Sequence, residues 1–325
     1  MKKKIFIAGG SGYVGCHLAK KLVNMGHFVR VLDLQLYGKN LEESENLELI
    51  KGDIRNTALV DETLKGVDTV IHLACISNDP SFELNPTLGK SINLDSFQPF
   101  VSSCVKNKVK QFVYASSSSV YGIKNITNVT EEEKLNPITD YSKYKVMCEN
   151  ILLSNKSNMI KTIIRPATVC GYSKRLRLDL VINIITKLAF FEKKIKIFGG
   201  DQLRPNIHID DMIDAYILMM NVSNDKINNK IYNVGYENLS LNNIAKKVQN
   251  VFGEDVKVEK IPTDDHRSYH ISSNKINKEL DFKPKKNIDQ AISDLKEYFI
   301  NNSKMEDFSQ DIYYNIKRMQ NINLK

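Results

Sequence analysis

A tyrosine and a lysine four residues apart, Tyr141 and Lys145, have the side-chain types of a proton-transferring pair. Four residues make about one turn of a helix, so the two side chains share a helix face, and Asp140 is placed to cap that helix. A nearby ammonium group favours the phenolate form and lowers the pKa of a tyrosine, as a tyrosine general base requires. The same spacing is common on exposed helices, so the surrounding sequence has to decide its meaning.

A glycine-rich turn near the N-terminus indicates where a second reactant would bind. Gly9, Gly12 and Gly15 separate an apolar run at residues 3–8 from an amphipathic segment at residues 13–25. The run predicts a β-strand and the segment predicts a helix. Glycines allow the backbone to turn tightly and to approach a pyrophosphate, which then lies at the helix N-terminus. A glycine cluster alone is usually a plain turn, but in this position it predicts a dinucleotide site.

An aspartate at the end of the second predicted strand indicates which dinucleotide binds. Asp33 closes the apolar run at residues 28–34, where a carboxylate accepts a hydrogen bond from the adenine-ribose 2′-hydroxyl. A carboxylate also repels a 2′-phosphate, which favours NAD over NADP, and Arg30 lies inside the strand, away from that position. A solvated strand-end aspartate is the alternative. Asp53, after the third predicted strand, is expected to meet the adenine.

Strand and helix patterns alternate along the first half of the chain, which predicts right-handed crossovers and a parallel sheet. Near-continuous apolar runs, such as residues 69–74, suit strands that are covered on both faces. After Pro166, strand and helix patterns alternate less regularly. We therefore predict an α/β fold, a Rossmann-type doubly wound parallel sheet with a smaller α/β C-terminal substrate lobe. The NAD-binding domain is expected at residues 1–165 and 206–235 and the lobe at residues 166–205 and 236–325, with the ligand cleft between them.

Composition narrows the class of protein. The net charge of +8 is spread along the 325 residues, which indicates no nucleic-acid site and suits a polyanionic small ligand. No apolar run reaches the ~20 residues of a membrane span. Five scattered cysteines without Cys-x-x-Cys spacing favour reduced thiols and a cytoplasmic protein. The six histidines are dispersed and predict no metal site.

The ordered set of motifs resembles the extended short-chain dehydrogenase/reductase family, in its NAD-dependent nucleotide-sugar epimerase/dehydratase branch, over essentially the whole chain. Each motif is modest evidence, and their order makes the resemblance specific. In family order, the motifs are the glycine turn, Asp33, Gly52-Asp53-Ile54-Arg55, His72-Leu73-Ala74-Cys75, Ser116-Ser117-Ser118-Ser119-Val120-Tyr121-Gly122, Tyr141 with Lys145, and Arg165-Pro166.

The resemblance implies three catalytic residues. Ser117, four residues before Tyr121, would hydrogen-bond the sugar hydroxyl that is oxidised. Tyr141 would take the proton of that hydroxyl while the nicotinamide takes the hydride. Lys145 would lower the pKa of Tyr141 and bind the nicotinamide ribose. Without the resemblance, the serine run has the composition of a flexible loop, but it directly follows an apolar strand predicted at residues 111–115.

The resemblance also implies the residues that bind NAD and a nucleotide-diphosphate sugar. The implied cofactor-binding residues are Gly9, Gly12, Tyr13, Val14, Gly15, Asp33, Asp53, Ile54, Leu73, Ala74, Tyr141, Lys145 and Pro166. The implied substrate-binding residues are Ser118, Thr168, Arg175, Arg204 and Arg267. An arginine fork suits diphosphate oxygens. For each arginine, a surface ion pair is the alternative.

The reaction class follows from the residues after Ser117. Dehydratases of this branch carry an acid and a base there, whereas this chain has Ser118 and Ser119, so 4,6-dehydration is not expected. The resemblance implies an oxidoreductase or isomerase of carbohydrate biosynthesis, a sugar 4-epimerase that works through a 4-keto intermediate. The alternatives are a 4-dehydrogenase or keto-sugar reductase without epimerisation and, from another class, a non-catalytic NAD-sensing protein.

Two expectations concern assembly. Family members are commonly dimers, so the resemblance implies a homodimer through the helices predicted at residues 94–106 and 141–153. The tail at residues 301–325 is too aromatic for a disordered tag. We expect it to pack on the protein or on a partner subunit.

Overall fold

The structure is a computed structural model that describes residues 2–325 except 125, 127, 264–267, 269, 323 and 325. Arg267, which the resemblance implies as a substrate-binding residue, therefore lies outside the described residues.

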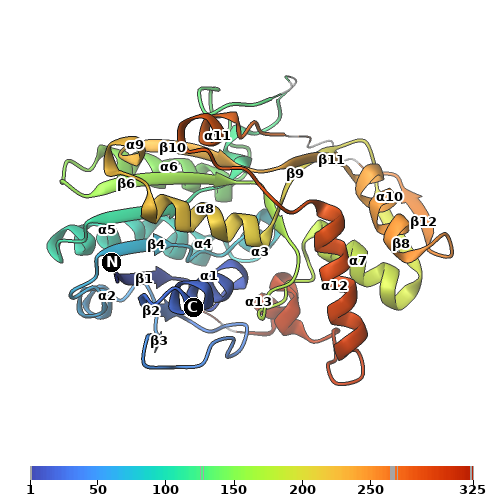
Figure 1. The fold of residues 1–325 in the computed structure, drawn as a ribbon, viewed down its shortest axis with the longest axis horizontal. Helices are drawn as coiled ribbons and strands as arrows, with labels where there is room; N and C mark the ends of the chain where they lie inside the picture. Colours follow the sequence, from blue (N-terminus) through green and yellow to red (C-terminus); the bar gives the residue numbers. More distant parts are fainter. Residues whose placement is uncertain are drawn as a thin grey trace.

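A parallel seven-stranded sheet forms the centre of the protein (Figure 1). Its strands lie in the order β10-β6-β5-β4-β1-β2-β3, and every neighbouring pair is parallel. The order reverses between β1 and β4, and ligands of doubly wound sheets bind at the carboxyl ends of the strands at such a point. The strands are β1 (Lys4–Ala8), β2 (Phe28–Asp33), β3 (Leu47–Lys51), β4 (Thr69–His72), β5 (Gln111–Ala115), β6 (Ile160–Pro166) and β10 (Lys230–Val234).

Helices cover both faces of this sheet, because successive side chains of each strand point to opposite faces. In β1, Ile5 and Ile7 belong to one buried cluster, and Phe6 and Ala8 belong to the other. The first face is covered by α1 (Tyr13–Asn24) and α8 (Ile209–Asn221), and the second by α2 (Thr57–Thr63), α5 (Phe97–Lys106) and α6 (Asp140–Ser154). The near-continuous apolar runs of the sequence are thus explained.

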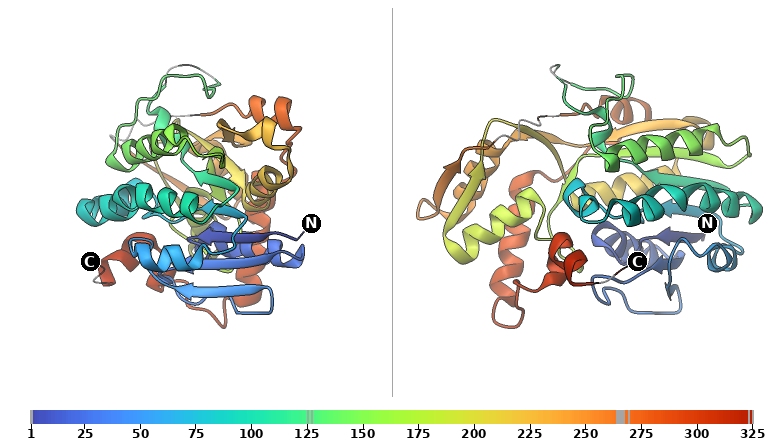
Figure 2. Two further views of the ribbon diagram at one scale, coloured as in Figure 1. Left: turned by 90° about the vertical axis from the view of Figure 1, so that its left-hand side faces the viewer. Right: turned by 180° about the vertical axis from the view of Figure 1, so that it is seen from behind.

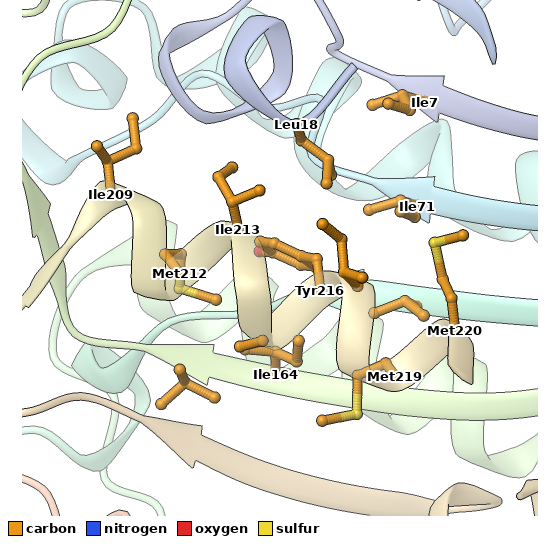
Figure 3. Close-up of a cluster of buried hydrophobic side chains, with 14 of the residues drawn as sticks. Ile7, Leu18, Ile71, Ile164, Ile209, Met212, Ile213, Tyr216, Met219 and Met220 are labelled. Atoms are coloured by element: carbon orange, nitrogen blue, oxygen red, sulfur yellow. The ribbon is translucent and has the colours of Figure 1, made fainter. Parts of the chain in front are cut away.

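The packing of α8 shows what stabilises this core. Met212, Ile213 and Tyr216 of α8 belong to one buried cluster with Ile7 and Ile71 of the neighbouring strands β1 and β4 (Figure 3). All five side chains are 0–2% exposed, and each fully buried aliphatic side chain contributes about 1.5–3 kcal/mol.

A smaller lobe lies beside the sheet (Figure 2). It has a three-stranded sheet in the order β11-β9-β7 and a two-stranded sheet of β12 and β8. Its core contains Ile185, Ile197, Ile244 and Ile292 from four different elements. The strands are β7 (Thr168–Cys170), β8 (Lys194–Phe198), β9 (Leu203–His208), β11 (Glu237–Ser240) and β12 (Lys257–Ile261), and the helices are α7 (Val181–Glu192), α10 (Leu241–Phe252) and α12 (Ile288–Asn302).

Short helical elements connect these layers. They are α3 (Asp79–Glu83), α4 (Pro86–Lys90), the π-helical η1 (Ser91–Asp95), the 3-10 helix η2 (Ser118–Tyr121), α9 (Asn224–Ile227), α11 (Asn274–Leu280), the 3-10 helix η3 (Asp311–Tyr313) and α13 (Asn315–Asn321).

The structure confirms the predicted α/β class and the Rossmann-type sheet, while the residue boundaries of the two domains stay a prediction. The predicted cap of the tyrosine helix is wrong. Thr139, not Asp140, precedes the helix, since its hydroxyl accepts the amide of Ser142 at 3.3 Å and its own amide bonds the Ser142 hydroxyl. No helix in the described ranges is long and apolar enough to cross a membrane.

Candidate active site

The glycine turn forms a tight cradle between β1 and α1. Gly9 has a φ of +78°, and a Cβ on it would lie 2.7 Å from the backbone of Ala74. A Cβ on Gly15 would lie 2.4 Å from the carbonyl oxygen of Gly9. Gly12 caps α1 without a side-chain hydrogen bond, so no side chain occupies the first amides of the helix. These features fit the pyrophosphate of a dinucleotide, which binds to backbone amides at a helix N-terminus.

A cavity of about 260 Å³ opens at this cradle and brings most of the predicted site together. The predicted residues on its wall are Gly9, Gly12, Tyr13, Val14, Gly15, Asp33, Ile54, Leu73, Ala74, Tyr141, Lys145, Pro166 and Arg175. Among the residues that the structure describes, the predicted Asp53, Ser117, Ser118, Thr168 and Arg204 are not part of this wall.

The end of β2 offers a carboxylate at the position expected for the adenine ribose. Asp33 accepts hydrogen bonds from the amides of Ser11, at 2.9 Å, and of Gln35, at 2.7 Å. Burial raises the pKa of Asp33, and the two amides oppose that rise. Arg30 points elsewhere, since its guanidinium pairs with Glu48 at 2.6 Å. Asp33 therefore places a carboxylate at the cavity where the 2′-hydroxyl of the adenine ribose of NAD is expected.

The carboxylate of Asp53 is engaged beside the cavity. Arg55 donates to it at 2.6 Å, and the cavity wall is made by its neighbours Gly52 and Ile54. Although burial opposes it, the hydrogen bond from Arg55 lowers the pKa of Asp53. The expectation that Asp53 meets the adenine stays a prediction.

The structure brings the serine, the tyrosine and the lysine together where β5 ends. Tyr141 lies in the first turn of α6, and the side chain of Ser117 is close enough to lower its pKa, against the larger effect of burial. Ser117 caps η2, and its hydroxyl lies 2.8 Å from that of Ser119. One helical turn after Tyr141, the buried Lys145 donates to the carbonyl of Ala115 at 2.7 Å, with its Nζ 5.7 Å from the centroid of the tyrosine ring.

The direction of the tyrosine pKa differs from the prediction. Desolvation raises the pKa of Tyr141 well above its usual value, and the neighbouring Cys75 and Asp79 raise it further. The groups that oppose this rise most strongly are Arg177 and Ser117, not Lys145. Lys145 is turned toward a backbone carbonyl, so its charge does not dominate the phenol. The predicted net lowering by Lys145 is therefore wrong for this arrangement.

A buried ionic network holds both ends of the serine segment. Arg165 makes two hydrogen bonds to Glu149, at 3.0 and 2.7 Å, and a third to the hydroxyl of Tyr121 at 2.8 Å. Glu149 also accepts from the hydroxyl of Ser116. Because Ser116 and Tyr121 flank Ser117 in sequence, this network fixes the backbone that presents the serine predicted to be catalytic.

Two arginines of the lobe reach the cavity. Arg175 and Arg177 are 3% and 8% exposed and both line it. Arg177 pairs with Asp179 at 2.8 Å and donates to Ser77 at 3.1 Å. In the described part of the chain, Nε of Arg175 and Nη2 of Arg177 are buried donors without a protein partner. Such atoms fit the oxygens of a bound phosphate-containing ligand.

The remaining predicted substrate residues lie farther from this cavity. Thr168 lies in β7, next to the cavity-lining Val169, and Ser118 is 4% exposed within η2. Arg204 lies in β9 of the lobe, where it donates to its neighbour's carbonyl at 3.0 Å. A bound sugar nucleotide would have to extend from the cavity toward the lobe to reach it.

Sequence reasoning missed several residues of the cavity wall. Tyr37 stacks under the guanidinium of Arg175 at 3.9 Å, and Ser77 and Asn315 complete that corner. Arg177 was not among these missed residues, because the sequence already places it with Arg175 in one variable loop expected to meet the substrate. Asn315 carried none, because nothing local connects the C-terminal tail with the cavity.

Comparisons with known proteins identify the family. A model of the NAD dependent epimerase/dehydratase family matches residues 5–235. The chain is 30% identical over 316 residues to a UDP-glucose 4-epimerase of Lactobacillus helveticus, which covers 89% of this chain and 95% of that protein. It is also 30% identical over 276 residues to a dTDP-D-glucose 4,6-dehydratase of Dictyostelium discoideum, which covers 77% of this chain and 62% of that protein.

Solved structures share the fold. A UDP-glucose 4-epimerase of Thermotoga maritima, solved with UDP-glucose, has a TM-score of 0.82 at 22% identity, and the match covers 92% of this chain and 99% of that one. MoeE5, solved with UDP-glucuronic acid and NAD, has a TM-score of 0.81 at 24% identity with the same coverage.

The chain therefore belongs to the NAD-dependent epimerase/dehydratase family of extended short-chain dehydrogenases/reductases. NAD is the cofactor of this family, and the glycine cradle and Asp33 fit it. Relatives with known names include nucleotide-sugar epimerases, dehydratases and a decarboxylase. Among the described residues, no group of three histidine, cysteine or acidic side chains could hold a metal ion.

Proposed function

We propose that the protein is an NAD-dependent epimerase that inverts C4 of a nucleotide-diphosphate sugar through a 4-keto intermediate. The observation that carries the proposal is that Tyr141, with Ser117 beside it, and Lys145 line the cavity that also contains the glycine cradle and Asp33. Proton transfer and dinucleotide binding are thereby served by one site.

Ser117, Tyr141 and Lys145 have different roles in the oxidation of the sugar hydroxyl. Ser117 holds the hydroxyl by a hydrogen bond, and Tyr141 accepts its proton. NAD, when bound, supplies the acceptor for the hydride that leaves C4. Lys145 lies one turn after Tyr141, where it anchors the helix to the carbonyl of Ala115 and would bind the nicotinamide ribose. After the ketone turns over, C4 would take the hydride back on its opposite face, and Tyr141 returns the proton to the oxygen.

Substrate recognition is proposed for the lobe side of the site. Ser118 and Thr168 would contact the sugar, and Arg204 and Arg267 would grip the diphosphate. The named relatives that act on or bind UDP-sugars support this class of substrate.

The dehydratase relatives make water elimination the main competing reaction. Elimination needs an acid and a base near the sugar, and the two residues after Ser117 are Ser118 and Ser119, which titrate too weakly for either role. A carboxylate near Tyr141 is present in Asp79, but it accepts the hydroxyl of Thr139 at the helix cap. Epimerisation is thus favoured over dehydration.

The test is to incubate the NAD-loaded enzyme with UDP-, GDP-, CDP- and dTDP-sugars and to read mass and NADH absorbance together. An isomer of unchanged mass without net NADH is expected. Loss of two hydrogens with NADH would indicate the 4-dehydrogenase alternative, and reduction of a supplied keto sugar by NADH would indicate a reductase. Loss of water would refute the interpretation of Ser118 and Ser119. Binding of NAD without any turnover would favour a non-catalytic NAD-sensing protein.

We also propose a cytoplasmic homodimer, in keeping with five free cysteines. The expected interface lies on α5 and α6, where Val105 and Met147 are 37% and 46% exposed. Light scattering of the purified protein should give twice the mass of 37.1 kDa. Asp substitutions of Val105 and Met147 should then yield the monomer.

A further inference from the structure

The C-terminal segment folds back from the lobe onto the cofactor side of the protein. Residues 303–322, here called the C-terminal strap, follow α12 and contain η3 and α13 (Figures 1 and 2). The strap lies outside the residues that the family model matches, 5–235. Met319 of α13 packs into the core cluster of the N-terminal sheet, and Tyr314 packs into a cluster of the lobe. The strap therefore connects the two parts of the molecule.

Asn315 makes the hydrogen bonds that attach the strap to the cavity wall. It is 2% exposed, and its side-chain oxygen accepts Nη2 of Arg175 at 2.6 Å. Its side-chain amide donates to the hydroxyl of Ser77 at 3.0 Å, and its backbone amide donates to Asp179 at 2.9 Å. Two separate segments, the loop that contains Arg175 and Asp179 and the loop that contains Ser77, are thus held to the strap by one residue.

These contacts lie in the wall of the cofactor cavity. Arg175, Ser77 and Asn315 all line it. Arg175 stacks on Tyr37, 3.9 Å from the ring centroid, and Arg318 of the strap donates to the carbonyl of Leu36. Tyr37 and Leu36 belong to the loop that follows Asp33. The strap therefore fixes both the arginine and the loop at the end of the cavity where the adenine ribose would lie.

The part of the cavity wall around Arg175 and Arg177 is suited to bind an anion. Arg175 and Arg177 are buried side by side, and Nε of the first and Nη2 of the second find no partner among the described residues. Burial and the neighbouring charge of Arg177 lower the pKa of Arg175 to about 10. Two adjacent buried cations with spare donors are stabilised when a phosphate oxygen enters. The position beside Asp33 and the glycine cradle points to the pyrophosphate of NAD.

We propose that the C-terminal strap is part of the dinucleotide site, with Asn315 positioning Arg175 on the bound NAD so that the cofactor is released slowly. Arg175 then serves the cofactor and not the sugar nucleotide. The use of slow release rests on the proposed function, because an epimerase must keep the reduced cofactor until the ketone is reduced again.

The test compares NAD release from the intact chain and from three variants of α13. Asn315→Leu removes the acceptor of Arg175 and should speed release about ten- to hundredfold, the range expected for one lost charge-assisted hydrogen bond. Asn315→Asp keeps an acceptor and should stay within about threefold of wild type. Gln320→Ala, an exposed position of the same helix, is the matched control and should change nothing. Release is followed by dilution and chromatography of the protein-bound nucleotide.

A second measurement needs no variant. Hydrogen exchange of the wild-type chain should slow at residues 311–322 when NAD is added. Each of three results would overturn the proposal. Asn315→Leu could release NAD at the wild-type rate, Asn315→Asp could release it as fast as Asn315→Leu, or hydrogen exchange in the strap could stay unchanged when NAD is added. If Asn315→Leu does not fold, the exchange measurement decides. Because neither readout involves a sugar, failure of the epimerase assay leaves this result independent.

Discussion

The buried ion pair behind the serine segment gives the sharpest test of how the site is held. Arg165 and Glu149 have side chains that are 3% and 2% exposed and form two parallel hydrogen bonds. Although burial opposes the charge, the hydrogen bonds and charge of Glu149 hold the pKa of Arg165 above its usual value. We predict that Glu149→Met, which leaves the arginine buried and unpaired, costs about 3–5 kcal/mol of unfolding free energy.

A double-mutant cycle separates the pair from its surroundings. Arg165→Met should also cost about 3–5 kcal/mol, because it leaves a buried carboxylate with only the Ser116 hydroxyl. The double variant replaces both charges by apolar groups of similar length. It should cost clearly less than the sum of the single changes, by about 2 kcal/mol or more. The coupling arises because neither desolvated charge remains in the double variant.

The assay is urea unfolding followed by far-UV circular dichroism, since the chain has no tryptophan. The matched control is Asp140 and Lys143, an ion pair on the same helix with an N–O distance of 3.0 Å and side chains 52% and 51% exposed. Asp140→Asn should cost less than about 1 kcal/mol. Single costs at Arg165 and Glu149 as small as this control, or costs that simply add, would refute the reasoning.

Three further predictions concern the reacting groups and the cradle. Tyr141→Phe should lower turnover about 10²–10⁴-fold with NAD affinity nearly unchanged. Because the pKa of Tyr141 is raised, the rate of sugar oxidation by the wild-type enzyme should increase from neutral to alkaline pH. A rate that does not change with pH would contradict this. Burial lowers the pKa of His72 to about 3, so below pH 6.5 the unfolded chain binds a proton that the folded chain does not. The free energy of unfolding should therefore fall by about 2 kcal/mol from pH 6.5 to pH 5. This loss should disappear in His72→Leu when unfolding is measured at both pH values. In Gly15→Ala, the new Cβ would lie 2.4 Å from the carbonyl oxygen of Gly9, so the protein should lose about 1–3 kcal/mol of unfolding free energy. In Gly12→Ala, the new Cβ would lie 3.3 Å from the same oxygen. This variant should fold normally and bind NAD more weakly in calorimetry.

Local patterns made much of the fold predictable. The strand that ends before Gly9, the helix that begins after Gly12 and the carboxylate at Asp33 are defined by neighbours in sequence, and the structure places all three at one cavity. The pair of Tyr141 and Lys145 was equally predictable in position, because the helix fixes a four-residue spacing.

The electrostatic behaviour of that pair was not predictable. The side chain of Lys145 donates to Ala115, and the charge that most strongly favours the phenolate of Tyr141 comes from Arg177, which is 36 residues away in sequence. The helix cap was likewise assigned to Asp140 although Thr139 has the capping geometry. A pKa depends on desolvation and on charges that only the folded chain brings near.

By itself, the sequence determined the class of fold, the glycine cradle and the shared helix face of Tyr141 and Lys145, because each depends on residues within one turn or one strand. Only the tertiary structure decided what surrounds them. It placed Arg175 and Arg177 in the cofactor cavity, buried Arg165 against Glu149, and brought Asn315 from the C-terminal tail to the wall beside Ser77. Such contacts join segments far apart in the chain, and their energy arises from burial and charge pairing that no local pattern encodes.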